Sequence, residues 1–254
     1  MSELNLKTYN STRIVKWYDN LNAVTLVEKH FFETNKELIA QGSVLDIGIG
    51  GGRTTSYLIN KCKKYIGIDY SEGFVNAVKK KHLTADIRLM NATDLSEFEN
   101  NSFDLINFSF NGIDYVGFED RKKILSEIHR VLKPNGLFLF STHNKDHFTY
   151  NRAPWSNAQN GFITNLKNFI KLLPFLPRHL NQKSKEIHLQ DYAIINDSAH
   201  NYNLLTFYTS PAFLKQQLTE HKFGNIALFS KNATLVEEGE LDDWIFISCE
   251  KLSS

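Results

Sequence analysis

Residues 43–141 alternate short apolar segments with helical patterns, and this alternation limits the possible folds more than any other feature of the chain. Short apolar strands that alternate with helices predict a parallel sheet covered on both faces. We therefore expect an α/β fold with a doubly wound, mostly parallel sheet. The expected strands are Ser43–Ile47, Tyr65–Ile68, Ile87–Met90, Phe103–Phe108 and Leu137–Ser141.

The sequence on either side divides the chain into parts around this core. Apolar residues at helical spacing predict one or two helices within the N-terminal segment, residues 1–40. The alternation breaks over residues 144–201, a stretch too long for a plain connection, which we expect to be an inserted cap. Residues 202–254 return to the pattern with a helix at Pro211–His221 and a final strand pair. Residues 41–143 and 202–254 together are thus the expected core.

Composition excludes several classes of protein. The chain has 254 residues and a net charge of +1, which suits one sizeable domain and argues against a protein that coats nucleic acid. No apolar run approaches the ~20 residues that span a bilayer, and the first residues contain no apolar signal core. Cys62 and Cys249 are too few and too far apart for a disulfide scaffold or a cysteine zinc site. We expect a cytoplasmic protein, with its oligomeric state left open.

The most informative motif is a glycine-rich turn after the first strand, in Val44-Leu-Asp-Ile-Gly-Ile-Gly-Gly-Gly-Arg53. Glycines there allow a sharp turn and let a ligand approach the backbone. Asp69 ends the next strand, where a carboxylate can accept hydrogen bonds from a ribose diol. A nicotinamide fingerprint needs a small residue where Arg53 stands, so the motif fits that class poorly. An ordinary glycine turn beside a buried aspartate is the structural alternative.

Several segments in order resemble a family of enzymes. VLDIGIGGGRTT, YIGIDYS, LMNATDL, SFDLINFSFNGIDYV and LSEIHRVLKPNGLFLFSTHN resemble the successive motifs of class I S-adenosylmethionine-dependent methyltransferases that act on small molecules. The resemblance covers about residues 40–143 and the terminal strand pair. It implies a seven-stranded sheet with an antiparallel last strand, S-adenosylmethionine across the carboxyl ends of the first strands, and residues 1–40 as a lid over the cofactor.

The resemblance also implies which residues bind the cofactor. They are Asp46, Gly48, Gly50, Asp69, Tyr70, Asn91, Ala92 and Phe108. Asp46 would reach the methionine ammonium group through water or its neighbours, and Asp69 would hold the ribose hydroxyls. Asn91 stands where the family usually has an aspartate that accepts from the adenine amine, and its amide oxygen can also accept.

The acceptor of the methyl group is narrowed by exclusion. The fourth motif contains no Asn/Asp-Pro-Pro-aromatic run typical of DNA amine methylation and no Pro-Cys nucleophile. Transfer to an oxygen or nitrogen of a small molecule is the expected reaction, with His143 as first choice for a general base and Asp114 as a second candidate. Tyr115 and Tyr208 are expected to line the substrate pocket. The alternatives are a cofactor-binding regulatory domain or pseudoenzyme, and an RNA or protein methyltransferase.

The insertion has an unusual charge pattern. From Arg152 to Lys185 there are six basic residues and no acidic one, and apolar residues recur at helical spacing over residues 162–173. Such a helix can lie on a membrane, cap an anionic substrate or simply pack with its lysines solvated. We expect a lid over an acceptor with a carboxylate or phosphate, such as a nucleotide-linked sugar, with Arg152 and Arg178 binding it. A lid buries its apolar face, so no membrane binding is expected, and the histidine spacings predict no metal site.

Overall fold

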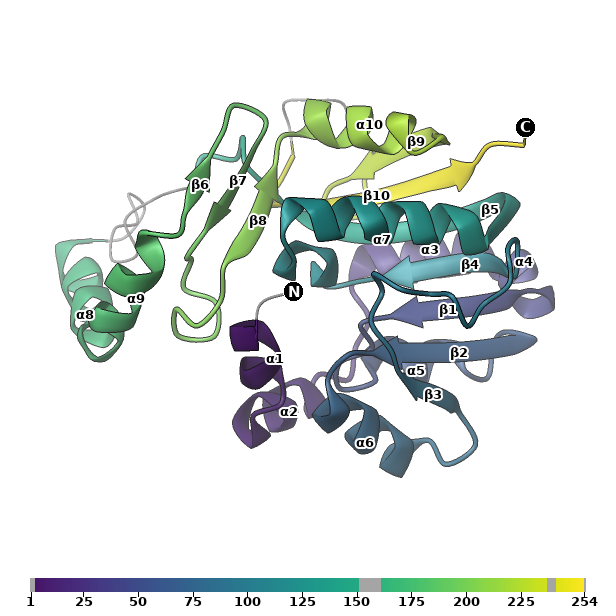
Figure 1. Ribbon diagram of the computed structural model, residues 1–254, viewed down its shortest axis with the longest axis horizontal. Helices are drawn as coiled ribbons and strands as arrows, with labels where there is room; N and C mark the ends of the chain where they lie inside the picture. Colours follow the sequence, from purple (N-terminus) through teal and green to yellow (C-terminus); the bar gives the residue numbers. More distant parts are fainter. Residues whose placement is uncertain (1–2, 151–160, 237–240, 254) are drawn as a thin grey trace.

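The structure, a computed structural model, describes residues 3–150, 161–236 and 241–253. Its centre is a seven-stranded sheet in the order β3-β2-β1-β4-β5-β10-β9, in which β10 is antiparallel to both neighbours (Figure 1). These strands are β1 (Ser43–Ile47), β2 (Lys64–Asp69), β3 (Asp86–Leu89), β4 (Phe103–Phe108), β5 (Leu132–Asn144), β9 (Phe223–Phe229) and β10 (Trp244–Lys251). The expected doubly wound sheet with an antiparallel strand near one end is confirmed.

Helices cover both faces of this sheet. On one face, Ile124 and Leu214 belong to the same apolar core as Ile106 of β4. On the other, Leu58 and Val75 pack in a second core with Val44 of β1. The helices of the first face are α7 (Phe118–Val131) and α10 (Pro211–Glu220), and those of the second are α3 (Leu26–Thr34), α4 (Lys36–Gln41), α5 (Arg53–Leu58) and α6 (Glu72–Lys81).

Two short helices lie at the carboxyl edge of the sheet, α1 (Glu3–Tyr9) and α2 (Thr12–Asp19). Tyr9 is buried with Phe74 of α6 and Leu204 in a small third cluster, which anchors this segment over the strand ends. The N-terminal segment thus contains four described helices where the sequence predicts one or two.

The described part of the insertion contains more helices and strands than the sequence predicts. It forms a lobe at one side of the sheet (Figure 1). Its elements are α8 (Phe162–Leu172), the 3-10 helix η2 (Leu173–Phe175), α9 (Leu176–Lys183), β6 (Ile187–His188) and β7 (Tyr192–Ile195). β7 pairs with β8 (Thr206–Thr209), and β8 pairs with the last two residues of β5, so the whole sheet has ten strands rather than seven. Strands of two and four residues are too short to show a strand period in the sequence.

The expectation that the helix of residues 162–173 buries its apolar side is wrong for Ile163 and Ile170, which are 68% and 56% exposed. The helix lies at the outer end of the lobe (Figure 1). Among the helices of the described residues, none is long and apolar enough to cross a membrane.

Candidate functional site

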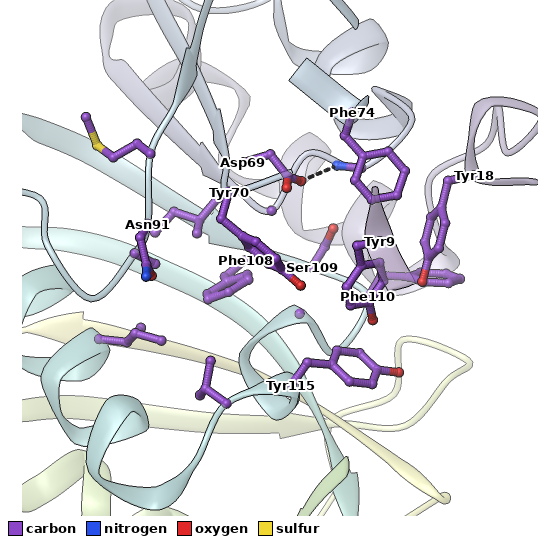
Figure 2. Close-up of a pocket in the computed structure, with 18 residues that line it drawn as sticks. Tyr9, Tyr18, Asp69, Tyr70, Phe74, Asn91, Phe108, Ser109, Phe110 and Tyr115 are labelled. Carbon is purple, nitrogen blue, oxygen red and sulfur yellow. Dashed lines mark hydrogen bonds between the residues drawn. The ribbon is translucent and has the colours of Figure 1, made fainter. Parts of the chain in front are cut away.

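A cavity opens at the carboxyl ends of β1, β2 and β4. The glycine turn, the loop after β3 and the N-terminal helices contribute its walls. Figure 2 shows Tyr9, Tyr18, Phe110 and Tyr115 on one side of this cavity and Asn91 on the other. A parallel sheet binds ligands at this edge, beside the first strand, so the cavity lies where the topology predicts a site.

The glycine turn adopts a backbone that other residues disfavour. Gly48 and Gly50 have φ of +65° and +53°, in the left-handed region. A Cβ on Gly48 would lie 2.9 Å from the Phe108 ring, and one on Gly51 would lie 2.2 Å from the backbone oxygen of Tyr18. The absence of side chains therefore lets the turn pack closely against the end of β4 and against α2.

Asp69 ends β2 and lines the cavity with a buried carboxylate. Its Oδ2 accepts from the backbone N–H of Gly50 at 3.0 Å (Figure 2). Its Oδ1 accepts from the backbone N–H of Ser71 at 2.8 Å. Burial raises the pKa of this carboxyl to about 6, although the two N–H groups oppose the shift. Each oxygen keeps a further lone pair for a ligand hydroxyl.

Asp46 lies behind the glycine turn, from where it could act on a ligand only through water or its neighbours, as the resemblance implies. Its side chain is fully buried, and it is not among the residues that line the cavity. Its carboxylate accepts three hydrogen bonds of 2.7 Å, from the hydroxyls of Thr54 and Tyr65 and the amide of Asn107. These bonds tie β1 to α5, β2 and β4, so Asp46 holds the glycine turn in position from behind.

The loop after β3 supplies a polar and an apolar wall. Asn91 and Ala92 line the cavity, and Asn91 Oδ1 accepts from the backbone N–H of Thr93 at 3.1 Å. Because that N–H needs an acceptor, the amide NH₂ of Asn91 remains as the donor for a ligand. Tyr70 and Phe108 also line the cavity, and the buried Tyr70 hydroxyl has no hydrogen-bond partner in the described structure.

A second cavity adjoins the first. Tyr18, Phe110 and Tyr115 line both cavities. The rest of its wall combines α2, the end of β5, the loop before β8 and the start of β10. These residues are Arg13, Ile14, Lys16, Trp17, Asn20, His143, Asp197, Ser198, Ala199, His200, Asn201 and Trp244. Part of the insertion, residues 197–201, therefore reaches this cavity although α8 does not.

His143 and Asp114, singled out separately from the sequence, are in direct contact. His143 Nδ1 lies 2.7 Å from Asp114 Oδ2, which also accepts from the backbone N–H of His143. A carboxylate only accepts, so Nδ1 carries a proton, and in the neutral imidazole Nε2 is then an acceptor. Nε2 lies 3.2 Å from the amide nitrogen of Asn111, which donates to it. The Asp114 carboxylate thus holds the imidazole in one tautomer and orientation.

A buried arginine compensates the charge of Asp114. Arg121 on α7 donates to Asp114 Oδ1 at 2.9 Å, and both side chains are fully buried. Its guanidinium also lies over the Phe207 ring, 4.7 Å from the centroid. Burial lowers the pKa of Arg121, and the Asp114 charge opposes this. Arg121 repeats with Ile124, Leu125 and Ile128 on the buried face of α7, a charge on an apolar helical face that the sequence analysis did not use.

Three other sequence-predicted substrate residues have different outcomes. Arg152 lies outside the described residues. Arg178 on α9 is exposed and donates to the backbone oxygen of Asn201 at 3.2 Å, and it is not among the described residues that line either cavity. Tyr208 packs beside His143 with ring centroids 4.8 Å apart and donates to Asp197 at 3.0 Å, so it supports the wall of the second cavity.

A further ion pair, missed from the sequence, braces the glycine turn. Arg53, which begins α5, forms a two-pronged pair with Glu28 of α3 and donates to Ser109 at 3.0 Å. Glu28 is fixed in turn by a capping box with Thr25, whose side chain accepts from the Glu28 N–H. The spacing Thr25-x-x-Glu28 before an apolar segment is a visible signal of that cap.

The comparisons with known proteins agree with this site. Residues 45–140 match the family model described as a methyltransferase domain. The chain is 30% identical over 135 residues to a probable S-adenosylmethionine-dependent methyltransferase of Mycolicibacterium smegmatis, covering 50% of this chain and 51% of the relative. It is 32% identical over 105 residues to malonyl-[acyl-carrier protein] O-methyltransferase 1 of Coxiella burnetii, covering 41% and 34%. The chain thus spans about half or less of the length of these two relatives.

Solved structures share the fold. One is a possible histamine N-methyltransferase of Thermotoga maritima, with a TM-score of 0.58, 16% identity and coverage of 99% of this chain and 100% of that one. Residues 45–140 are therefore an S-adenosylmethionine-dependent methyltransferase domain within a class I fold, with S-adenosylmethionine as the cofactor. The expected enzyme class and cofactor are confirmed for this domain.

Proposed function

We propose that the whole chain transfers a methyl group from S-adenosylmethionine to an oxygen or nitrogen of a small molecule that carries an anionic group. The observation that carries this proposal is the pair of adjoining cavities with the shared wall of Tyr18, Phe110 and Tyr115. The first would hold the cofactor and the second the acceptor, so that both reactants meet at the shared wall. Of the proteins reported above, one is a malonyl-[acyl-carrier protein] O-methyltransferase and another is a possible histamine N-methyltransferase, which supports both atoms as candidates.

The residues of the first cavity fit the cofactor. Asp69 offers a carboxylate for two ribose hydroxyls, Asn91 an amide and Tyr70 an aromatic face for the adenine. Gly48 and Gly50 leave the turn open to the methionine part, with Phe108 at the end of β4 beside it. The cofactor supplies a methyl group activated by a sulfonium. We assign Asp46 an indirect part, since it orients the turn rather than the ligand.

Replacing Asp69 by alanine should weaken S-adenosylmethionine binding by about 1–3 kcal/mol, because the ribose hydroxyls lose their acceptor. The pKa of about 6 adds a pH dependence. Hydroxyls donate to the ionised carboxylate, so bound cofactor lowers this pKa and affinity rises with pH up to about 6. Calorimetry should show constant affinity above about pH 7 and a loss approaching tenfold per unit below pH 6. Asp69→Asn, which cannot ionise, should lose that slope; an unchanged slope would exclude Asp69 as its source.

We assign the general-base role to His143, on the wall of the second cavity. Alignment of the two reactants supplies most of the acceleration of an in-line displacement. A hydroxyl acceptor must also lose its proton, which the Nε2 lone pair can take when the acceptor displaces the Asn111 amide. Asp114 would then stabilise the imidazolium that forms.

The anionic acceptor follows from the cations at the rim of the second cavity. Arg13 and Lys16 of α2 line it, and within the described part of the chain neither side chain has a hydrogen-bond or ion-pair partner. Trp17 and Trp244 add aromatic wall beside them. These residues replace Arg152 and Arg178, the pair expected from the sequence, as the proposed anion-binding groups.

The double variant Arg13→Ala/Lys16→Ala should raise KM for the acceptor by about 3–10-fold per charge removed, because each loses one charged hydrogen bond at an exposed site. KM for S-adenosylmethionine should change much less. The matched control is Lys79→Ala/Lys80→Ala on the exposed side of α6. It also removes two positive charges, but at a site that lines neither cavity. An equal rise of KM for the acceptor in both double variants would show a general effect of charge, and it would exclude an anion-binding site at Arg13 and Lys16.

One experiment tests the function itself. The protein is incubated with methyl-labelled S-adenosylmethionine and a cell extract that is then divided into small-molecule, protein and nucleic-acid fractions. Label in the small-molecule fraction supports the proposal. Label in protein or nucleic acid favours the macromolecular alternative, and cofactor binding without any transfer favours a regulatory domain or pseudoenzyme.

A further inference from the structure

Helix α8 is oriented in an unusual way. Successive residues of a helix are about 100° apart, so Asn165, Asn168 and Leu172 lie on one side. That side faces the protein, because Leu172 is 3% exposed and the two asparagines are half-buried. The broad apolar side points elsewhere, which reverses the usual arrangement of an amphipathic surface helix.

The outward side is what we call the apolar face of α8. It consists of Ile163, Leu166, Ile170 and, in η2, Leu173. These side chains are 68%, 47%, 56% and 47% exposed. Large aliphatic groups grouped on one helical face and exposed to water mark an interaction site, whereas scattered ones need no explanation.

The charged residues in this stretch of the sequence all have one sign. Lys167 and Lys171 are exposed and lie one turn apart beside it. From residue 162 to residue 185 there are three more basic residues, Arg178, Lys183 and Lys185, and no acidic one. The net charge of the whole chain is only +1, so this excess is local.

We propose that the apolar face of α8 binds the surface of an anionic lipid bilayer. An interfacial helix needs aliphatic or aromatic residues on one side and lysines beside them, and it needs no complementary groove. The position of α8 at the outer end of the lobe leaves it accessible to a flat surface (Figure 1). A second copy of the chain fits less well, because pairing the same face would bring Lys167 and Lys171 of both copies together.

This binding is independent of the proposed acceptor. Residues of α8 are not among the described residues that line the two cavities. The helix would lie in the headgroup region rather than cross the bilayer. Variants of its face should therefore leave methyl transfer to a soluble acceptor unchanged, which separates a failure of this proposal from a failure of the proposed function.

The test is co-sedimentation of the full chain with vesicles of phosphatidylcholine containing about a third phosphatidylglycerol, compared with phosphatidylcholine alone. We expect binding to the anionic vesicles that weakens with added salt. Ile163→Gln/Ile170→Gln should lower the partition coefficient by about tenfold or more, and Lys167→Glu/Lys171→Glu should lower it as strongly. All four side chains are exposed, so both variants should melt at the temperature of the unchanged protein.

Two matched variants serve as controls. Leu26→Gln/Leu83→Gln removes two exposed leucines elsewhere, and Lys79→Glu/Lys80→Glu makes the same charge change on α6. Both should bind anionic vesicles like the unchanged protein. No binding to anionic vesicles, equal binding to both vesicle types, or equal losses in the controls would overturn the proposal. So would a dimer that Ile163→Gln/Ile170→Gln dissociates without any vesicle binding.

Discussion

Replacing His143 by alanine is expected to lower kcat by about 10²–10⁴-fold, because the acceptor hydroxyl loses the base that takes its proton. The imidazole is poised for this, since its Nδ1–H is held by Asp114 and its Nε2 lone pair faces a displaceable amide. His143 lines the second cavity and not the first, so the Kd for S-adenosylmethionine should hardly change. Single-turnover rates and calorimetry measure the two quantities separately.

The control is His30→Ala, which removes an exposed histidine from α3. Asp114→Asn should reproduce part of the loss, because an amide can donate to Nδ1 and so favour the other tautomer. A His143→Ala variant with an unchanged kcat at saturating acceptor would contradict the base assignment. An amine acceptor, which is nucleophilic without prior loss of a proton, would then be the better assignment.

The core of the fold was predictable because its signals are local. β1 and β4 are apolar strands that end in turns, and the structure has them at the predicted bounds. The glycine turn and Asp69 were predictable for the same reason. A positive φ is indicated by a glycine, and a carboxylate at the end of a strand is indicated by a single aspartate. Their place at one edge of the sheet follows from parallel topology.

The rest depends on contacts between distant segments. The fold leaves Asp46 the indirect role that the resemblance implies, but its hydrogen bonds to Tyr65 and Asn107 join distant segments and could not be predicted from the sequence. The amphipathic pattern of residues 162–173 predicts a helix correctly yet does not say which face is buried. Since a lid and a membrane-binding helix share one pattern, the outward face of α8 could be recognised only in three dimensions.

The second large effect is on stability. Replacing Arg121 by methionine should lower the free energy of unfolding by about 3–5 kcal/mol, because the change leaves the Asp114 carboxylate buried without its cation. Both side chains are fully buried, so water cannot solvate the remaining charge without opening the core between α7 and the sheet. Urea denaturation near neutral pH measures this loss as a lower midpoint with an unchanged slope.

The loss of unfolding free energy should come from the buried, uncompensated charge of Asp114 and not from the loss of an arginine side chain in general. Arg88→Met removes a partner from the partly exposed pair with Asp86 and should cost only about 0–1 kcal/mol. Arg121→Met/Asp114→Asn removes both charges of the buried pair and should be more stable than Arg121→Met alone. The opposite result is a double variant that is less stable than Arg121→Met, by as much as Asp114→Asn alone destabilises the unchanged protein. Arg121 would then not be compensating a buried charge. The hydrogen bonds of Asp114 to Thr142 and His143 would then be the interactions that hold this end of β5.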